Sequence, residues 1–324
     1  MLTYTLRRVL WTIPVLFVVV TMLFFMMRSI EGSPLRRGQL VGISNVYWSK
    51  SGDWRPPSIE RNMTRKFQLD LPWYRQYLNY LEAVARFDFG NTLSYRYQTV
   101  NSIIERQGRV SLELGLLAFL LAVGVGVPVG VLAALKAGTA VDGLARFGAA
   151  LASSVPAFLV GSLLIYLVAV RWGLVPTSGW DSWRAKLLPT ITLALLPAAW
   201  CVRLVRGAML ETLSSDHIRA ASAKGLRRTR VVGVHALRNS LVPVVTALGP
   251  IVGYLVTGSF VVEMVFSIPG IGRYYVAGVL ARDYPLVLGL TVVLTVAVIV
   301  ANLLVDLLHV ALDPRLRDAV ATSA

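Results

Sequence analysis

The sequence has little that could support covalent or metal chemistry. It holds one cysteine, Cys201, so a disulfide within the chain is excluded. Its three histidines, His217, His235 and His309, do not have the spacing of metal ligands. No phosphate-binding G-x-x-x-x-G-K-[ST] loop and no nucleophile–base arrangement occurs. We therefore predict no catalytic, cofactor or metal site in this chain.

Charge is also scarce. Charged residues make up 15% of the 324 residues and hydrophobic residues 56%, with a mean hydropathy of +0.64. The net charge of +15 could suggest nucleic acid, but that needs a folded basic surface with base-reading elements. Here the cations lie in connectors between long apolar blocks, as in a membrane protein anchored by Lys and Arg. We therefore exclude nucleic acid as a partner and expect membrane lipid.

Six apolar blocks are long enough to cross a bilayer, which takes about 20 residues. They are about Val9–Met27, Leu112–Leu135, Leu144–Val170, Leu187–Leu204, Leu241–Val262 and Pro285–Val310. The first follows Arg7 and Arg8, so a signal peptide must be considered, but the block is longer than a usual signal core and no small-x-small cleavage site follows it. We interpret it as a retained span. Pro189 and Pro197 interrupt the fourth block.

The orientation of the spans follows from the Lys and Arg of the short connectors. With a cytoplasmic N-terminus, the inside segments carry Arg7, Arg8, Lys136, Arg146, Arg203, Arg206, Arg219, Lys224, Arg227, Arg228, Arg230, Arg238, Arg315 and Arg317. The short outside loops carry Arg171, Arg184, Lys186, Arg273 and Arg282. This bias predicts that both termini are cytoplasmic.

The first outside loop, about Arg28–Arg109, is predicted to be partly structured. Its centre, Trp48–Pro57, is polar and rich in turn residues, and a short helix is expected at about Thr99–Gln107. Between them, helical spacing after Pro72 predicts an amphipathic helix on the membrane surface. The residues with this spacing are Trp73, Tyr77, Leu78, Leu81 and Ala85. Such helices could either cap the outer mouth or contact a protein that delivers solute.

In the second block, Gly126 and Gly130 form a small-xxx-small pair. Such a pair lets two membrane helices approach closely, so we expect helix packing there.

The inside loop between the fourth and fifth blocks, Glu211–Thr246, contains a short helix signal. Ser214, Ser215 or Asp216 can cap its start, and Gly225 supplies the left-handed position that ends it. Ile218, Ala221 and Ser222 share one face, and Lys224 suits the C-terminal dipole. Two turns are too few to be stable alone in water. The helix must therefore pack on something, either a groove of another protein or anionic lipid.

Several motifs in order resemble the peptide and nickel branch of ABC importer permeases. The spacing Ala220-Ala221-x-x-x-Gly225, then Leu237-Arg238-Asn239 and Pro243, is similar to the EAA loop of these permeases. SSVPAF, WGLVPTSG, LLPTITLAL, FSIPGIGRY, ARDYPLV and NLLVDLLHVALDPR look like the same branch, and most like the first permease of dipeptide and oligopeptide importers. The glutamate of the broad EAA pattern is Arg219 here, so a glutamate contact is not carried over.

The resemblance implies an all-α polytopic fold of about six transmembrane helices, with a type I ABC importer permease core in the inner membrane. Residues 1–27 would be the cytoplasmic N-terminus and first span, 28–109 an extracytoplasmic loop region, 110–310 the permease core with a coupling loop at about 205–240, and 311–324 a cytoplasmic tail. The implied ATPase-docking residues are Asp216, Ile218, Arg219, Ala220, Ala221, Lys224 and Gly225.

The resemblance also implies the partners: a second homologous permease, two cytoplasmic ATPase subunits that bind ATP and Mg, and an extracytoplasmic solute-binding protein. The chain itself would not be an enzyme. The most direct hypothesis is transport of di- or oligopeptides. Nickel or another small solute is the alternative within the family, and an ion-coupled secondary transporter is the alternative outside it. The latter needs ionisable residues within the membrane, for which the candidates are Glu113, Asp306 and His309.

Overall fold

The computed structural model describes residues 2–29, 70–95 and 98–312, and their regular secondary structure is helical apart from one isolated bridge between Asn91 and Thr99. The turn-rich centre Trp48–Pro57 and the tail from residue 313 onward lie outside the described residues. The chain divides into two compact units, and three of the four boundaries between them fall inside long helices. One unit comprises residues 1–8, 110–269 and 298–324, and the other residues 9–109 and 270–297.

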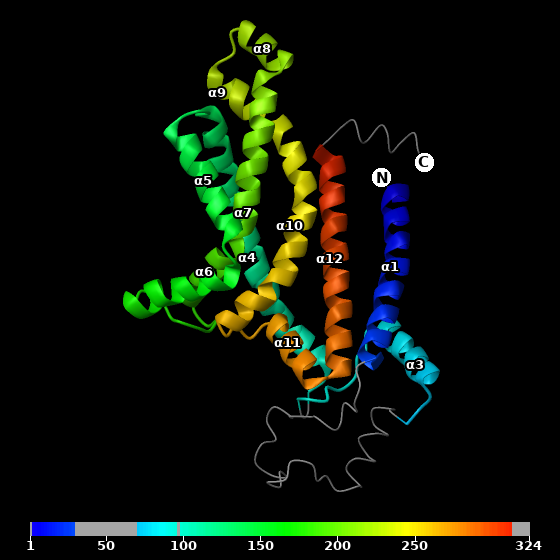
Figure 1. Cartoon of the computed structure of the whole chain (residues 1–324). Coiled ribbons are helices and arrows are strands. Elements are labelled where there is room, and N and C mark those ends of the chain that lie inside the picture. The colour runs from blue at the N-terminus through cyan, green and yellow to red at the C-terminus, as the bar shows by residue number, and fades with distance from the viewer. Residues whose placement is uncertain (1, 30–69, 96–97, 313–324) are drawn as a thin grey trace. The chain divides into compact units, whose positions relative to one another are not determined.

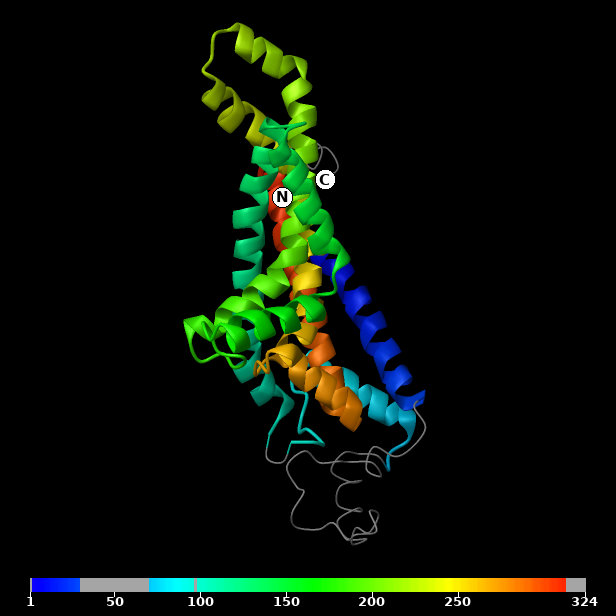
Figure 2. The same cartoon turned by 60° about the vertical axis from the view of Figure 1, so that its left-hand side comes forward.

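The first unit holds the long loop and the helices that lead to it. Its elements are most of α4 (Val100–Leu135), then α5 (Ala140–Ser154), α6 (Ala157–Leu164), the π-helical η1 (Ile165–Arg171), α7 (Trp183–Ser214), α8 (Asp216–Ala223), α9 (Arg228–Arg230), the π-helical η2 (Val231–Ala236), α10 (Leu237–Val265) and the end of α12 (Tyr284–Leu312). Helices α5, α7 and α10 run alongside one another, and α8 and α9 lie beyond one end of α7 and α10 (Figures 1 and 2).

Five described helices are long and apolar enough to cross a membrane, and a sixth crossing is possible if the pair α5 and α6–η1 counts as one span. This pair corrects the third predicted block, Leu144–Val170, because the chain bends there by 102° instead of continuing as one helix. Val155 is extended, with ψ 126°, because the following Pro156 disfavours helical backbone in the residue before it. Pro156 then precedes the first residue of α6.

Helix α7 continues through both of its prolines. It runs for 32 residues from Trp183, and the hydroxyl of Ser182 caps its start by accepting the Ala185 N–H at 3.3 Å. Pro189 and Pro197 are buried inside it. Prolines are tolerated in membrane helices where neighbouring helices surround the freed carbonyls. The predicted fourth span is therefore a single helix that extends ten residues beyond Leu204.

Packing of α4 on α7 depends on the two glycines singled out in the sequence. A β-carbon on Gly126 would lie 2.5 Å from Cys201 Cβ, and one on Gly130 would lie 2.8 Å from Val205 Cβ. Both would also lie 2.9 Å from a carbonyl oxygen of α7. The packing interpretation of the pair is confirmed. Cys201 is fully buried at this contact.

The second unit contains most of α1 (Leu2–Ser29), all of α3 (Trp73–Ala85) and α11 (Ile271–Ala281), and the start of α12. The predicted amphipathic helix is present as α3, and its Tyr77 packs on α1, 2.6 Å from the Thr21 hydroxyl. Trp73 and Leu78 remain exposed. The short helix expected at Thr99–Gln107 is not separate, because α4 runs unbroken from Val100.

Asp283 organises the junction between α11 and α12 in this unit. Arg282 ends α11 in the left-handed conformation, with φ 56°. The buried Asp283 carboxylate then accepts the N–H of Leu286 in the first turn of α12 at 3.2 Å and the N–H of Ser94 at 2.8 Å. Burial raises the pKa of Asp283, and these backbone donors oppose the rise.

Candidate functional site

Helix α8 is the short helix predicted in the inside loop. It spans Asp216–Ala223, two turns, and Gly225 follows it with φ +73°, the left-handed conformation expected of the residue that ends it. At its start, the Ser214 hydroxyl donates to the Glu211 carbonyl and the Ser215 hydroxyl to the Thr212 carbonyl. The backbone carbonyl of Ser215 accepts the first helical N–H groups.

One side of α8 packs against its own chain. Ile218 is 5% exposed and lies in a cluster of buried apolar residues from four other elements. These are Ala134 of α4, Val205 and Met209 of α7, Val231 and Ala236 of η2 and Val244 of α10. The partly buried Ala221 packs on the same cluster. Because this cluster supplies the packing that two turns need, α8 is folded without a partner in the structure.

The opposite side of α8 is open. Asp216, Arg219, Ala220, Lys224 and Gly225 are exposed. Both side chains of the Arg219–Asp216 pair, 3.4 Å apart, are exposed, so the pair contributes little to stability. Of the residues predicted to dock an ATPase, these five are therefore free to meet a partner, whereas Ile218 and most of Ala221 face inward. The docking role of the helix itself stays a prediction.

The two helices that carry the loop are tied together beneath it. Ser240 of α10 is buried, and its hydroxyl lies 3.1 Å from Thr212 Oγ1 of α7 and 2.7 Å from the carbonyl oxygen of Ala236. Sequence reasoning missed this contact, although Ser240 follows directly on the Leu237-Arg238-Asn239 motif. The two helices that flank the loop are therefore hydrogen-bonded to each other next to it.

Two separate sets of polar contacts made by α4 involve one predicted candidate and one residue that was missed. Glu113 of α4 accepts from Lys186 Nζ at 2.5 Å and from Trp180 Nε1 at 2.9 Å, so it is an ion-pair partner in this structure. Glu263 of α10 is fully buried and accepts the Ser111 hydroxyl at 2.7 Å. A lone carboxylate in an apolar run was the signal for Glu263, which lies one residue past the fifth predicted block.

Among the described residues, no group of three or more His, Cys, Asp or Glu side chains could hold a metal ion. The exposed face of α8 carries the cations Arg219 and Lys224 and the carboxylate of Asp216.

Comparison with known proteins identifies the family. A family model described as "Binding-protein-dependent transport system inner membrane component" matches residues 126–318, which include α8 and both helices that carry it. The chain belongs to this family. The permease is therefore a multi-pass protein of the inner membrane and a component of an ABC importer, and the family resemblance drawn from its motifs is confirmed.

Relatives that match along nearly the whole chain are permeases named for peptide transport. The permease is 38% identical over 319 residues to the oligopeptide transport system permease protein OppB of Haemophilus influenzae, covering 98% of this chain and 100% of the relative. It is 38% identical over 317 residues to the dipeptide transport system permease protein DppB of Bacillus subtilis, covering 98% of each. It is 39% identical over 323 residues to OppB of Escherichia coli K12, covering 98% of this chain and 100% of the relative.

A solved structure supports the fold. A chain from inward-facing conformations of the MetNI methionine ABC transporter superposes with a TM-score of 0.54 at 20% identity, over 65% of this permease and 96% of that chain. At this identity the likeness concerns the fold alone. The predicted all-α fold with a type I ABC importer permease core is confirmed.

Proposed function

We propose that this permease is one of two transmembrane subunits of an importer for di- or oligopeptides. The observation that carries the proposal is the match along 98% of the chain to permeases named for oligopeptide and dipeptide transport. The second permease and the extracytoplasmic solute-binding protein are parts of the same proposal. The solute would pass between the two permeases.

The proposal assigns ATP chemistry to two partner subunits in the cytoplasm, which bind ATP and Mg. Each would contact an exposed face like that of α8, formed here by Asp216, Arg219, Ala220, Lys224 and Gly225. The anchoring of α8 by Ile218 supports this role, because a helix already packed on α7 and α10 passes a push directly to them. Closure of the ATPases would then exchange two discrete arrangements of the spans.

Cross-linking and uptake test the proposal. A photo-reactive amino acid in place of Ala220 is expected to capture an ATP-binding subunit in native membranes, and the same probe at the exposed Leu144 of α5 serves as the control. Proteoliposomes of the purified assembly should take up a labelled tripeptide in an ATP-dependent manner. Uptake of nickel and not of peptide would reject the peptide assignment and favour the small-solute alternative.

The orientation of the loop gives a second prediction. Ala223 is exposed next to Lys224, so Ala223→Cys in a Cys201→Ala background presents one accessible thiol. With α8 in the cytoplasm, an impermeant maleimide should leave intact cells unlabelled and react after the membrane is permeabilised. Equal labelling before and after permeabilisation would invert the topology and remove α8 from the side where ATP is hydrolysed.

Glu113 separates an ATP-driven permease from an ion-coupled transporter. Its pair with Lys186 is partly exposed, at 45% for the glutamate and 26% for the lysine, and such pairs contribute about 1 kcal/mol or less. Glu113→Gln should therefore leave both the stability and the ATP-dependent uptake nearly unchanged. A proton or cation relay through Glu113 would instead lose its driving force, and uptake by the variant would collapse irrespective of ATP.

A further inference from the structure

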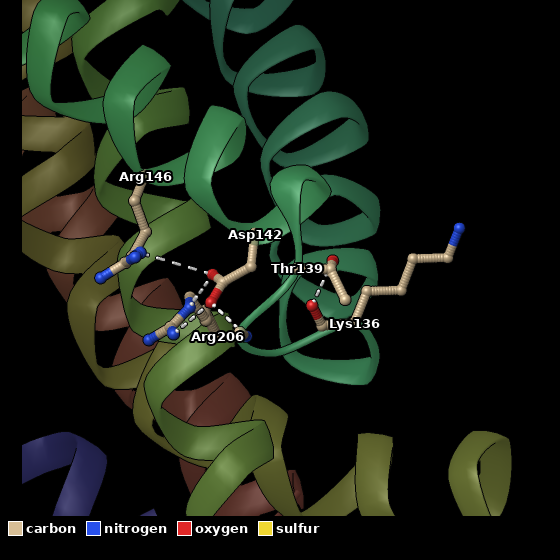
Figure 3. A network of polar contacts seen from close by, with 6 residues as sticks. Lys136, Thr139, Asp142, Arg146 and Arg206 are labelled. Atoms are coloured by element: carbon tan, nitrogen blue, oxygen red, sulfur yellow. Dashed lines mark hydrogen bonds and ion pairs between the residues drawn. The ribbon is translucent and has the colours of Figure 1, made fainter.

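An ion pair with a buried carboxylate and a partly exposed guanidinium joins α5 to α7 on the approach to the docking loop. Asp142, in the first turn of α5, is 2% exposed at its side chain. Its Oδ1 accepts Arg206 Nε at 2.5 Å, and its Oδ2 accepts the second arm of the same guanidinium at 2.8 Å (Figure 3). The Gly138 N–H adds a bond at 3.1 Å to Oδ2, and Arg146 lies 3.6 Å from Oδ1.

This pair connects three pieces of the chain. Gly138, with φ +79°, lies in the turn from α4 to α5, Asp142 begins α5, and Arg206 lies on α7 eight residues before its end. A guanidinium that meets a carboxylate through two parallel bonds fixes orientation as well as distance. The pair therefore sets both the rotation and the height of α5 on α7.

The apolar contact between the same helices is smooth. It consists largely of alanines, Ala145, Ala149 and Ala152 of α5 and Ala199 of α7, together with Val202 of α7, and Val129 of α4 packs on the same cluster. Small side chains bury little area and form shallow ridges, so they resist sliding poorly. Replacing a buried ion pair by apolar residues often leaves stability unchanged or raises it. The position of the Asp142–Arg206 pair points instead to a mechanical role.

Arg206 lies beside the residues that anchor the docking helix. Val205, next to it in sequence, and Met209 belong to the apolar cluster that surrounds Ile218 of α8. A displacement of α8 therefore enters α7 at the level of Arg206. From there the bidentate pair links α7 to α5 and to the α4–α5 turn, and an exposed hydrogen bond from Arg203 of α7 to Ser153 Oγ of α5 at 2.8 Å lies on the same contact.

We propose that Asp142 and Arg206 are positioning residues that make α5 and the α4–α5 turn move with α7 when a partner displaces α8. The proposal rests on the docking role assigned to α8 above. The pair converts a push on one short helix into a concerted movement of α7, α5 and the end of α4. Without it, α7 would slide along the alanine face of α5 and part of the displacement would be lost.

Two variants test the pair in the assembled importer. Asp142→Asn replaces one carboxylate oxygen with an amide donor, and Arg206→Lys keeps the charge but loses the fork. Each is expected to retain ATP hydrolysis within about two-fold and to lower the solute transported per ATP by ten-fold or more. The control, Glu82→Gln, breaks an exposed pair of similar length, Glu82–Arg86 at 2.6 Å, and should leave this ratio unchanged.

Spin labels measure the distance between α5 and α8, which an activity assay does not report. Labels at Leu144 of α5 and Ala223 of α8, both exposed, report the distance between the two helices in a Cys201→Ala background. The parent should give one narrow distribution, with and without trapped nucleotide, and the variants a broad one. Distributions that stay narrow in the variants would overturn the proposal. If Asp142→Asn does not insert, the same criteria apply to Arg206→Lys. If neither inserts, the charge-exchanged pair Asp142→Arg with Arg206→Asp decides, because a narrow distribution there supports the pair and a broad one overturns it.

The two proposals can fail separately. If the probe at Ala220 captures no ATP-binding subunit while the variants still broaden the distance distribution, the docking role fails and the mechanical link between α5 and α8 stands. If the subunit is captured and the distributions stay narrow, the docking role stands and the positioning role of the pair fails.

Discussion

Replacing Gly225 by valine is expected to lower solute uptake by about ten-fold while leaving insertion into the membrane intact. Gly225 ends α8 with φ +73°, where an L-residue pays about 1–2 kcal/mol, and a β-branched residue more. No atom lies within 4 Å of a β-carbon built there, so the penalty comes from the backbone and not from a collision. A shift of that size lowers the ratio of the correctly ended helix to its alternatives by about ten-fold. Uptake by reconstituted proteoliposomes measures the effect.

Two controls isolate the conformational cause. Gly225→Asn should retain most uptake, because asparagine tolerates the left-handed region better than other residues. Gly233→Val, in η2 of the same loop, places the same side chain at an exposed glycine that has no atom within 4 Å, and it should be nearly silent. Full uptake by Gly225→Val would show that α8 needs no fixed end and would argue against its docking role.

Gly126→Val is expected to prevent the permease from folding. Its β-carbon would lie 2.5 Å from Cys201 Cβ and 2.9 Å from the carbonyl oxygen of Ala198, and a backbone atom cannot turn aside as a long side chain does. Overpacking of a core costs about 1–3 kcal/mol and sometimes more. Here the whole α4–α7 contact would have to separate. The yield of monodisperse protein in detergent, measured by fluorescence-detected gel filtration, should fall close to zero.

Gly124 provides the matched control on the same helix. It is exposed, with no atom within 4 Å of a β-carbon, so Gly124→Val should give parental yield. Cys201→Gly should also improve the yield of Gly126→Ala, because it removes the nearer of the two obstructing atoms. Parental yield of Gly126→Val would mean that α4 and α7 do not pack as closely as described.

The membrane helices could be predicted because their signal is local. Runs of apolar residues located five helices and the region of a possible sixth crossing, and the glycine pair located a close contact. The error at Leu144–Val170 was avoidable, since Pro156 and its effect on Val155 are visible in the sequence. The sequence suggested a separate helix at Thr99–Gln107 because the first turns of α4 are polar. In the structure α4 is continuous through these polar residues and its apolar part.

Other features depend on contacts that no sequence window contains. The spacing of α8 placed Ile218 and Ala221 on one face, but only the folded α7, η2 and α10 decide that this face is the inner one. Asp142 and Arg206 are 64 residues apart and meet because α5 packs on α7. Arg206 had counted only as one cation of an inside loop, whereas it is the partner of a buried carboxylate.

The inward position of Ile218 has a consequence for inhibition. A free peptide with the sequence of Asp216–Gly225 would be a poor competitor, because at two turns it is unfolded in water and its largest apolar side chain has no cluster to occupy. If α8 docks a partner as proposed, the shape to be recognised is that of α8 together with the ends of α7 and α10 that hold it. A useful antagonist would have to mimic that folded tip, for example as a stapled hairpin or as a binder raised against the intact permease.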